Sequence, residues 1–497
     1  MRNQGLGSWA LRRARSTPHR TALVAGNDEL TYARLAERST RLAHTLRSMG
    51  TGPGDRVAYL GPNAPSFVET MFAVHLLGAV FVPLNTRLTA AELSFQLDDC
   101  GASVLLYDVR HDEVVRQLRV AAAPVTVTIG GDPAAADYET RLRAASAELI
   151  DELVGHADPA MILYTSGTTG RPKGAVLTHG NVIWNCLNVL IEIDITGDEV
   201  TLVSAPLFHV AALNMTLLPT LLKGGRAVLM TGWDVETCFD LVERHRVTWM
   251  FGVPTMFADL ARASRWSSAD LSSIRSLLAG GASVPTSLIA AYQERGLRFL
   301  QGYGLTEAGP GALIVTADMS TVKVGAAGVP HFFSDVRLAG PGLDGGGPEG
   351  ELLISSPTVM AGYWGRPDAT AAAVTDDGWI RTGDVARVDE DGYYSIVGRL
   401  KEMYISGGEN VYPAEVETAL LLHPAVAECA VIGVPDERWG EVGRAFVRLN
   451  PDRPAAEQEL LAFLDGRLAR YKIPKTVRFV DELPRTGSGK IHRGLLR

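Results

Sequence analysis

The chain of 497 residues is long enough for two to four domains with a large core, which excludes a peptide or a mini-protein. Its 47 Lys and Arg residues against 56 Asp and Glu residues give a net charge of −9, which argues against a protein whose main task is to coat nucleic-acid phosphates. Hydrophobic residues make up 46% and charged residues 21%, a balance that excludes wholesale disorder. We therefore expect a globular protein without a nucleic-acid partner.

The cysteines indicate a reducing compartment, and we expect a cytoplasmic protein. They are scattered, with neither a CxxC pair nor histidines at metal-ligand spacing, so neither a disulfide scaffold nor a zinc site is predicted. The first residues carry arginines but no apolar segment typical of a secretory signal. The longest apolar stretch, residues 202–222, is interrupted by prolines, His209 and Asn214, which favours core over a membrane span. We expect at most a peripheral contact with a membrane.

Helix and strand patterns alternate from the N-terminus to about residue 335. Apolar residues recur at helical spacing over residues 32–49, with Thr31 as a candidate N-cap and Gly50 at the C-cap position. Short apolar runs bounded by turn residues predict strands at 57–60, 80–83 and 103–107. This alternation is typical of an α/β fold with a parallel sheet.

The pattern changes after residue 335, where glycines separate shorter, strand-like runs and predict a β-rich subdomain. From Ser406 a small α+β unit is expected, with helices at 413–422 and 456–468 and strands near Val431 and Phe446. We place the domain boundary in the segment Gly398–Lys401. The predicted domains are thus residues 1–399, which contain the α/β sheets and the β-rich part, and residues 400–497.

The segment from Tyr164 to Gly174 is the most informative part of the chain. It holds four Ser or Thr hydroxyls, three glycines and a lysine between two short apolar strands. Glycines let backbone N–H groups face phosphate oxygens, hydroxyls add donors, and a lysine offsets the charge. The spacing is not that of a Walker A motif, and the composition alone also fits a solvent-exposed loop. The candidate phosphate-binding residues are Thr165, Ser166, Gly167, Thr168, Thr169, Gly170 and Lys173.

Six further motifs follow this loop. They are Gly280-Gly281-Ala282, the run Gln301–Glu307 (QGYGLTE), Gly350-Glu351-Leu352, the run Trp379–Asp384 (WIRTGD), the run Gly398–Glu402 (GRLKE) and the run Pro484–Lys490 (PRTGSGK). In this order the motifs resemble those of the adenylate-forming acyl-CoA synthetase superfamily, which contains acyl- and aryl-CoA ligases, firefly luciferase and peptide-synthetase adenylation domains. The resemblance covers nearly the whole chain. It implies a large adenylation domain and a small, mobile C-terminal domain.

The resemblance also implies how the base and the metal would be bound. The ring of Tyr303, between Gly302 and Gly304, suits stacking on adenine because the flanking glycines allow close backbone approach. Glu307 follows Thr306 and would bind Mg²⁺ beside the triphosphate of ATP, since magnesium takes carboxylates together with phosphate oxygens.

Ribose binding and catalysis follow from the later motifs. By resemblance, Asp384 would accept both ribose hydroxyls, and Arg399 would contact the ribose or phosphate oxygens. Lys490 would contact the substrate carboxylate and the α-phosphate, where its charge stabilises the transition state. The nucleotide site would further include Gly281 and Ala282. The implied catalytic set is Lys490, Thr165, Glu307 and His209.

The implied reaction has two steps. A carboxylate attacks the α-phosphorus of ATP, which gives acyl-AMP and pyrophosphate, and the thiol of coenzyme A then displaces AMP. No covalent enzyme intermediate is required, in agreement with the lack of a recognisable Ser-His-Asp or Cys-His arrangement. The family rotates its C-terminal domain between the steps, and Lys401 matches the hinge position. Gly407 and Gly408 would line the pantetheine tunnel. Trp439 would pack on the nucleotide of coenzyme A, although it also fits ordinary packing.

The sequence determines the identity of the substrate acid less well than it determines the reaction. The segments that form the acyl pocket in the family are mostly apolar or small here and contain no Arg or Lys, which disfavours a dicarboxylate; they are residues 206–210, 250–256, 280–283 and 304–311. His209 matches a gating position and also fits a core histidine. Residues 405–417 and 468–474 resemble the fatty-acyl-CoA ligases of actinobacterial type. A medium- or long-chain fatty acid is therefore the first prediction.

Several alternatives stay open. The chain can be a biosynthetic ligase for an aryl or polyene acid, or for an unusual acid such as nitrite. It can also be a stand-alone adenylation enzyme that loads a carrier protein in place of coenzyme A. A catalytically silent binding protein is disfavoured because all the motif residues named above are present. A homodimer is compatible with the sequence.

Overall fold

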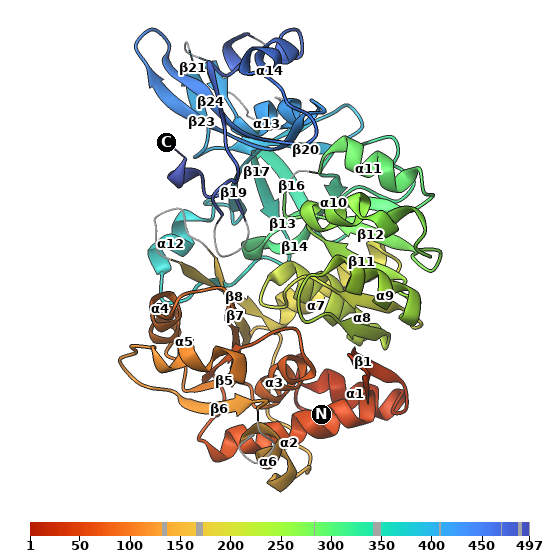
Figure 1. Ribbon diagram of the computed structural model, residues 1–497. Helices are drawn as coiled ribbons and strands as arrows, with labels where there is room; N and C mark the ends of the chain where they lie inside the picture. The colour runs from red at the N-terminus through yellow and green to blue at the C-terminus, as the bar shows by residue number, and fades with distance from the viewer. Residues whose placement is uncertain are drawn as a thin grey trace.

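The computed structural model divides into a large N-terminal domain and a small C-terminal domain (Figure 1). It describes residues 1–131, 137–165, 172–282, 284–340, 349–406, 409–468, 470–485 and 490–496. In Figure 1 the two α/β sheets lie in the lower part, the β-rich sheet lies above them, and the C-terminal domain lies at the top. The predicted fold class is confirmed.

The first α/β sheet contains seven strands over the described residues, and its centre is parallel. In spatial order these are β18 (Gly362–Tyr363), β8 (Lys173–Thr178), β7 (Pro159–Thr165), β4 (Val80–Pro83), β3 (Arg56–Leu60), β5 (Val104–Asp108) and β6 (Val125–Ile129). The three strands predicted in the first third are β3, β4 and β5, in their expected places. The consecutive strands β7 and β8 pair antiparallel, so the sheet is mixed. The helices of this part are α2 (Tyr32–Ser48), α3 (Pro65–Leu76), α4 (Ala90–Cys100), α5 (Asp112–Arg116) and α6 (Asp137–Ala144).

The helix predicted over residues 32–49 is α2. The hydroxyl of Thr31 accepts a hydrogen bond from the backbone N–H of Arg34, which confirms the N-cap. The helix ends at Ser48 with Met49 as its C-cap, and Gly50 follows with a φ of +93°, a conformation that glycine adopts without strain.

The second α/β sheet contains nine strands over the described residues. In spatial order these are β15 (Val329–Pro330), β14 (Gly309–Ile314), β13 (Phe299–Leu305), β12 (Ser276–Ala279), β11 (Trp249–Gly252), β9 (Val200–Val203), β10 (Arg226–Leu229), β1 (Thr21–Ala25) and β2 (Asp28–Thr31). Its helices are α1 (Ser8–Ser16), α7 (His179–Glu192), the π-helix η2 (Ala212–Leu217), α8 (Leu218–Lys223), α9 (Val235–His245), α10 (Pro254–Arg262), α11 (Thr286–Gln293) and the short 3₁₀ turns η3 (Ser264–Ser267) and η4 (Thr306–Ala308).

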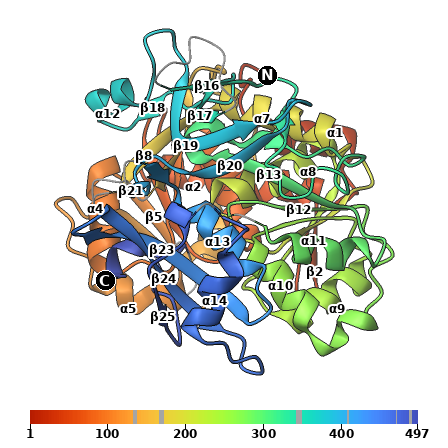
Figure 2. The same cartoon turned by 90° about the horizontal axis from the view of Figure 1, so that it is seen from above.

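The β-rich part is an antiparallel sheet of β16 (Asp335–Ala339), β17 (Glu349–Ser355), β19 (Ile380–Val388) and β20 (Tyr394–Arg399), with α12 (Pro367–Ala372) beside it. The C-terminal sheet consists of β22 (Glu409–Val411), β21 (Tyr404–Ser406), β24 (Gly440–Leu449), β23 (Val426–Asp436) and β25 (Thr476–Phe479). Its helices are α13 (Pro413–Leu421) and α14 (Glu457–Leu464). Seen from above, α13 lies near the centre of the molecule, next to β20 (Figure 2). The helix predicted to reach residue 468 ends at Leu464 because Asp465 is extended and Gly466 has a φ of +76°.

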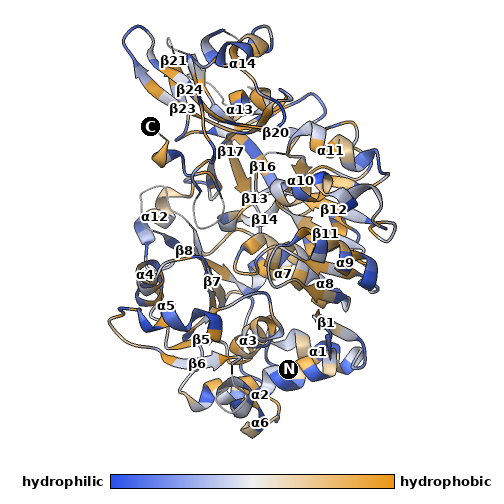
Figure 3. Ribbon diagram, viewed as in Figure 1, coloured by the Kyte–Doolittle hydropathy of each residue, from blue (hydrophilic) through white to orange (hydrophobic). Residues whose placement is uncertain are grey.

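One apolar core joins the two α/β sheets, and the C-terminal domain has its own. Figure 3 shows the apolar residues concentrated on the central strands and on the inward sides of the helices. The apolar stretch at 202–222 contributes β9, η2 and α8 to the first core, as predicted. Among the described residues, no helix combines the length and apolar character needed to cross a membrane.

Candidate active site

The first half of the candidate site is centred on the carboxylate of Glu307. This residue lies in η4, directly after the carboxyl end of β13, where ligands of α/β sheets commonly bind. The hydroxyls of Thr165 and Tyr363 both donate to its Oε1, at 3.1 and 2.9 Å. The Nζ of Lys173 lies 5.0 Å from the centre of the Tyr363 ring. Three strands of the first sheet, β7, β8 and β18, and the turn η4 after β13 of the second sheet thus supply a hydroxyl–carboxylate–cation group.

The local pairing explains how these residues meet. In the antiparallel register of β7 and β8, Thr165 is opposite Lys173, and β18 places Tyr363 opposite Ala175 on the other edge of β8. The backbone O of Glu307 accepts a hydrogen bond from Met360 N at 2.9 Å. This bond fixes the segment that leads into the short strand β18, and therefore Tyr363, beside η4.

The second half of the site is centred on Asp384, whose exposed fraction is only 6%. Arg399 is directly opposite Asp384 in the register of β19 and β20, and its Nε donates to Oδ1 at 2.9 Å. The hydroxyl of Tyr303 donates to Oδ2 at 2.6 Å. Burial, and next the charge of Asp384, hold the pKa of Tyr303 well above its ordinary value, so the phenol stays protonated and remains a donor. The backbone N–H of Asp384 donates to the hydroxyl of Thr382 at 3.0 Å.

Lys490 lies within electrostatic range of both halves, although it belongs to the C-terminal domain. Part of its length is exposed, but protein atoms crowd around it, and this desolvation followed by the charge of Arg399 lowers its pKa. The carboxylates of Asp384 and Glu307 act in the opposite direction. In the observed arrangement of the two domains, charged groups of the large domain thus act on the charge of Lys490.

His209, the fourth residue of the predicted catalytic set, lies in the segment after β9. Its pKa is lowered to about 4, chiefly by burial and then by the positive charges of Lys490 and Arg87. The imidazole is accordingly neutral near pH 7. Its ring is 4.7 Å from that of Phe208, and its backbone O accepts a hydrogen bond from Leu213 N.

The remaining predicted nucleotide-binding residues lie in or next to β12 and β13, or outside the described part of the chain. A Cβ on Gly304 would lie 2.2 Å from the carbonyl O of Pro310, so this glycine is required by the close approach of β13 and β14. Gly302 is also in β13, and Thr306 follows in η4. Gly281 and Ala282 come after β12, and Gly281 has a φ of +83°. The predicted binding residues Ser166, Gly167, Thr168, Thr169, Gly170, Gly407 and Gly408 lie outside the described residues.

The remaining predicted residues lie in the C-terminal domain. Lys401 is in the turn after β20, where the N–H groups of Glu402 and Met403 both donate to the backbone O of Arg399. Trp439 is exposed at the tip of the hairpin formed by β23 and β24. The guanidinium of Arg438 lies 4.9 Å from the centre of the Trp439 ring, and the backbone N–H of Trp439 donates to the carboxylate of Asp436.

Two residues of the site, Tyr363 and Thr382, were not predicted from the sequence. Tyr363 holds Glu307 although the two are 56 positions apart, and the only sequence signal is an aromatic pair between glycines in Gly362–Gly365. Thr382 precedes Asp384 within the WIRTGD motif, and a hydroxyl two residues before a buried aspartate is a plain signal for a local turn.

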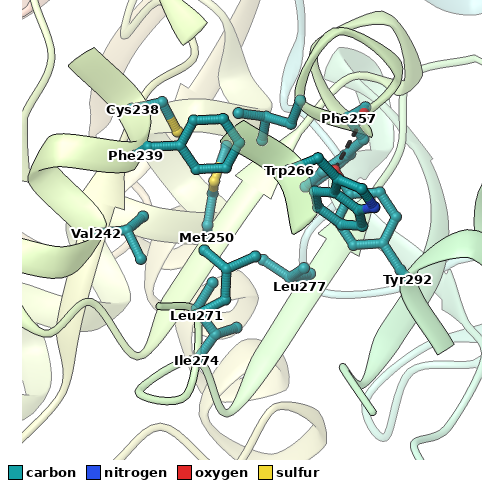
Figure 4. A pocket seen from close by; sticks show the side chains of 11 residues that line it. Cys238, Phe239, Val242, Met250, Phe257, Trp266, Leu271, Ile274, Leu277 and Tyr292 are labelled. Carbon is teal, nitrogen blue, oxygen red and sulfur yellow. Dashed lines mark hydrogen bonds between the residues drawn. The ribbon is translucent and has the colours of Figure 1, made fainter. Parts of the chain in front are cut away.

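The close-up in Figure 4 shows a different feature, an apolar cluster beneath α9 and α10. Its cavity has a volume of about 10 Å³, roughly the space of one water molecule, and is lined by residues such as Met250, Trp266 and Tyr292. It is therefore packed core and not a substrate site. The side chain of Met250, which belongs to a segment expected at the acyl pocket, faces this core.

Comparisons with known proteins show the family of the chain. The family model described as AMP-binding enzyme matches residues 11–364, and the model of the AMP-binding enzyme C-terminal domain matches residues 415–490. A feruloyl-CoA synthase from an Amycolatopsis species is 55% identical over 100% of this chain and 99% of its own length. A long-chain-fatty-acid–CoA ligase of Mycobacterium tuberculosis is 39% identical over 100% of this chain and 98% of its own.

A solved structure extends the comparison. The o-succinylbenzoate CoA synthetase of Bacillus subtilis is 34% identical, and its complex with an acyl-adenylate intermediate superimposes with a TM-score of 0.86 over 99% of this chain and 98% of that one. Its complex with ATP and a magnesium ion gives a TM-score of 0.87 over 98% and 99%. Ligases of this family use ATP, Mg²⁺ and coenzyme A, the cofactors that the resemblance implied. The chain therefore belongs to the AMP-binding enzyme family and is an acyl-CoA synthetase.

Proposed function

We propose that the chain activates an aryl monocarboxylic acid as its acyl-adenylate and transfers the acyl group to coenzyme A. The observation that carries the choice of acid is the 55% identity to a feruloyl-CoA synthase over the full length of both chains. The o-succinylbenzoate CoA synthetase also acts, by its name, on an aromatic acid. The geometry around Glu307 and Asp384 supports the reaction class, because it offers a place for a metal-bound triphosphate and for a ribose.

The carboxylate of Glu307 suits magnesium. The hydroxyls of Thr165 and Tyr363 both donate to Oε1 of Glu307. Within the described residues Oε2 forms no hydrogen bond, so it is available to a cation. Magnesium in proteins is commonly held by one or two carboxylates together with phosphate oxygens. Glu307 would hold Mg²⁺, whose charge offsets that of the phosphates.

In the adenylation step, this chain's residues position the substrates and stabilise charge. One carboxylate oxygen of the acid forms a bond to the α-phosphorus of ATP while the bond from that phosphorus to pyrophosphate breaks. Asp384 would accept the ribose hydroxyls, and the Tyr303 ring would lie against adenine. Lys490 would place its charge at the α-phosphate oxygens, which become more anionic in the transition state. Thr165 and Lys173 would contact the outgoing pyrophosphate.

The second step requires a different domain orientation. The thiolate of coenzyme A attacks the acyl carbon of acyl-AMP, and AMP leaves. In the observed orientation the carboxylates of Asp384 and Glu307 act on the charge of Lys490, which supports the proposed role of this lysine in adenylation. We propose that residues 400–497 then rotate about Lys401, so that Gly407 and Gly408 line the pantetheine path and exposed Trp439 packs on the nucleotide. The short turn after β20 is a suitable pivot because few residues must change their backbone angles.

A fatty acid is the second candidate. The 39% identity to a long-chain-fatty-acid–CoA ligase favours it, and it was the first prediction from the sequence. A polyene acid, nitrite, a carrier-protein acceptor and a homodimer stay predictions.

A substrate panel tests the proposal. Purified full-length protein with ATP and Mg²⁺ is given aryl, fatty and small acids and nitrite, each with and without coenzyme A, and pyrophosphate, AMP and thioester are measured. Aryl acids should give thioester with the highest kcat/KM and only in the presence of coenzyme A. Higher kcat/KM for fatty acids, or pyrophosphate release without thioester for every acid, would contradict it.

A further inference from the structure

A buried carboxylate near the end of α4 joins two segments of the candidate active site. The side chain of Asp99 is only 6% exposed. The hydroxyl of Tyr164 donates to its Oδ2 at 2.9 Å, and the guanidinium of Arg366 donates to its Oδ1. A buried carboxylate destabilises a fold unless such partners satisfy it, and the loss of a partner is costly. The two side chains that bind Asp99 are therefore held in place.

Tyr164 belongs to the first of these segments. Tyr164 and Thr165 are the last two residues of β7, and successive side chains of a strand point to opposite faces. The hydroxyl of Tyr164 binds Asp99, whereas the hydroxyl of Thr165 donates to the carboxylate at position 307 at 3.1 Å. Burial above all holds the pKa of Tyr164 well above its ordinary value, so the phenol stays protonated and remains a donor. Asp99 thus fixes the strand end from which Thr165 reaches Glu307.

Arg366 belongs to the second segment. It follows by three residues Tyr363, whose hydroxyl donates to Glu307 at 2.9 Å. The strand that carries Tyr363, β18, has two residues, so its own ladder supplies few hydrogen bonds. The backbone N–H of Arg366 donates to the backbone O of Tyr363 at 3.1 Å and closes the turn after the strand. The side chain of Arg366 then ties this turn to Asp99 on α4.

We propose that Asp99 is a positioning residue for the adenylation step. It holds the end of β7 and the turn after β18 against α4, so that the hydroxyls of Thr165 and Tyr363 keep Glu307 in one orientation. A misplacement of about 1 Å in such an arrangement lowers the rate by up to about a hundredfold. The inference rests on the proposed role of Glu307 and extends it to a residue that acts through others.

The test compares the two half-reactions in Asp99→Ala. Pyrophosphate release with ATP, Mg²⁺ and the preferred acid of the substrate panel should fall roughly tenfold, because the two hydroxyls lose their support. Thioester formation from the preformed acyl-adenylate and coenzyme A should stay near wild type, because that step uses no triphosphate. The Kd of ATP with Mg²⁺ in the absence of acid, measured by isothermal titration calorimetry, should rise severalfold.

Two milder variants grade the effect. Asp99→Asn keeps one acceptor oxygen and can satisfy only one of the two partners, so its rate should lie between those of wild type and Asp99→Ala. Arg366→Gln changes a half-exposed residue and leaves Tyr164 on Asp99, so it should show the same changes in smaller measure.

Asp112→Ala is the matched control. The carboxylate of Asp112 accepts from the hydroxyl of Tyr107 at 3.0 Å and pairs with Arg116 at 2.5 Å, so it has the same two kinds of partner as Asp99. Tyr107 lies on β5 of the same sheet, and β3 and β4 separate that strand from β7. Asp112→Ala should therefore leave pyrophosphate release and the Kd of ATP at wild type, whatever it does to the melting temperature.

Two results would overturn the inference. One is an equal rate of pyrophosphate release in Asp99→Ala and Asp112→Ala, and the other is an equal loss of both half-reactions in Asp99→Ala, which a merely structural role would produce. If Asp99→Ala does not fold, Asp99→Asn and Arg366→Gln carry the same comparison. If wild-type protein releases no pyrophosphate with any acid of the panel, or if Glu307→Gln is as active as wild type, the proposed function itself fails.

Discussion

At the residue scale, Glu307 and Asp384 share one arrangement. Each carboxylate is held by a tyrosine hydroxyl, Tyr363 for Glu307 and Tyr303 for Asp384, and each has a cationic side chain near it, Lys173 beside Tyr363 and Arg399 on Asp384 itself. Fixed donors orient a charged group before the substrate arrives, so less reorganisation is needed during the reaction.

The metal role of Glu307 gives the first prediction. Glu307→Gln keeps the shape and can keep an oxygen for both hydroxyls, but it removes the negative charge that Mg²⁺ requires. Pyrophosphate release should fall roughly a hundredfold, with a higher Mg²⁺ concentration needed for half-maximal rate. Glu29→Gln is the control, since Glu29 also accepts a hydroxyl, from Thr21 at 2.8 Å, at a remote exposed strand. Equal rates in the two variants would refute a metal role.

A second prediction concerns pH. Adenylation requires the charged form of Lys490, and its pKa lies below the ordinary value, so the rate should fall on the alkaline side earlier than an unperturbed lysine would allow. In Lys490→Arg the guanidinium does not titrate in this range, and the alkaline fall should move to higher pH even if the maximal rate is lower. Pyrophosphate release measured from neutral to alkaline pH shows this directly. An unmoved alkaline fall in Lys490→Arg would exclude Lys490 as its source.

At the element scale, the close approach of β13 and β14 gives a stability prediction. Gly304→Ala places a Cβ 2.2 Å from the Pro310 carbonyl, which is rigid backbone, and should destabilise the protein by about 2 kcal/mol or more. Gly302→Ala on the same strand meets the flexible end of Leu278 at 3.3 Å and should cost clearly less. Chemical denaturation of both variants makes the comparison, and equal losses would contradict the steric account.

The same elements show what the sequence could predict. Local patterns determined α2 with its Thr31 cap, the buried strands β3 to β5 and the α+β tail, because helix capping and apolar runs depend on neighbours in the chain. The motif residues around Glu307 and Asp384 were also found. The partner Tyr363 was not, because β18 reaches η4 only through long-range sheet pairing. The length of α14 was overestimated since apolar spacing continued past its end.

At the scale of the whole molecule, buried neutral histidines link stability to pH. Burial lowers the pKa of His75 and His331 to about 4, from an ordinary value of about 6.5. Unfolding exposes them to protonation, so their contribution is complete above about pH 6.5 and is lost as the pH falls toward 4. Each histidine accounts for roughly 2 to 3 kcal/mol over that range.

This linkage predicts the pH profile of the melting temperature. The wild-type melting temperature should fall steadily between about pH 6.5 and pH 4, and His75→Gln, which has no group to titrate there, should show a shallower fall. Scanning calorimetry at several pH values measures both. Identical slopes for the two proteins would mean that His75 does not carry this linkage.

The placement of the small domain is the feature on which the proposed mechanism depends most. Arg493, next to the catalytic motif, pairs with Glu402 at 3.0 Å and with Glu417 at 2.8 Å, which ties the C-terminal segment both to the turn after β20 and to α13. Lys490 and the segment after Arg399 are thereby held in one body. Rotation of that body would carry Lys490 away from the carboxylates of the large domain.

The most direct test separates the two half-reactions in Lys490→Ala, with Lys323→Ala as the control for loss of a lysine that pairs with Asp389 and Asp391. Pyrophosphate release is measured with ATP and 4-hydroxycinnamic acid, and thioester formation is measured with coenzyme A and the preformed acyl-adenylate. The account predicts that Lys490→Ala lowers the first rate roughly a hundredfold or more and leaves the second near wild type. Equal loss in both half-reactions, or loss in neither, would contradict it.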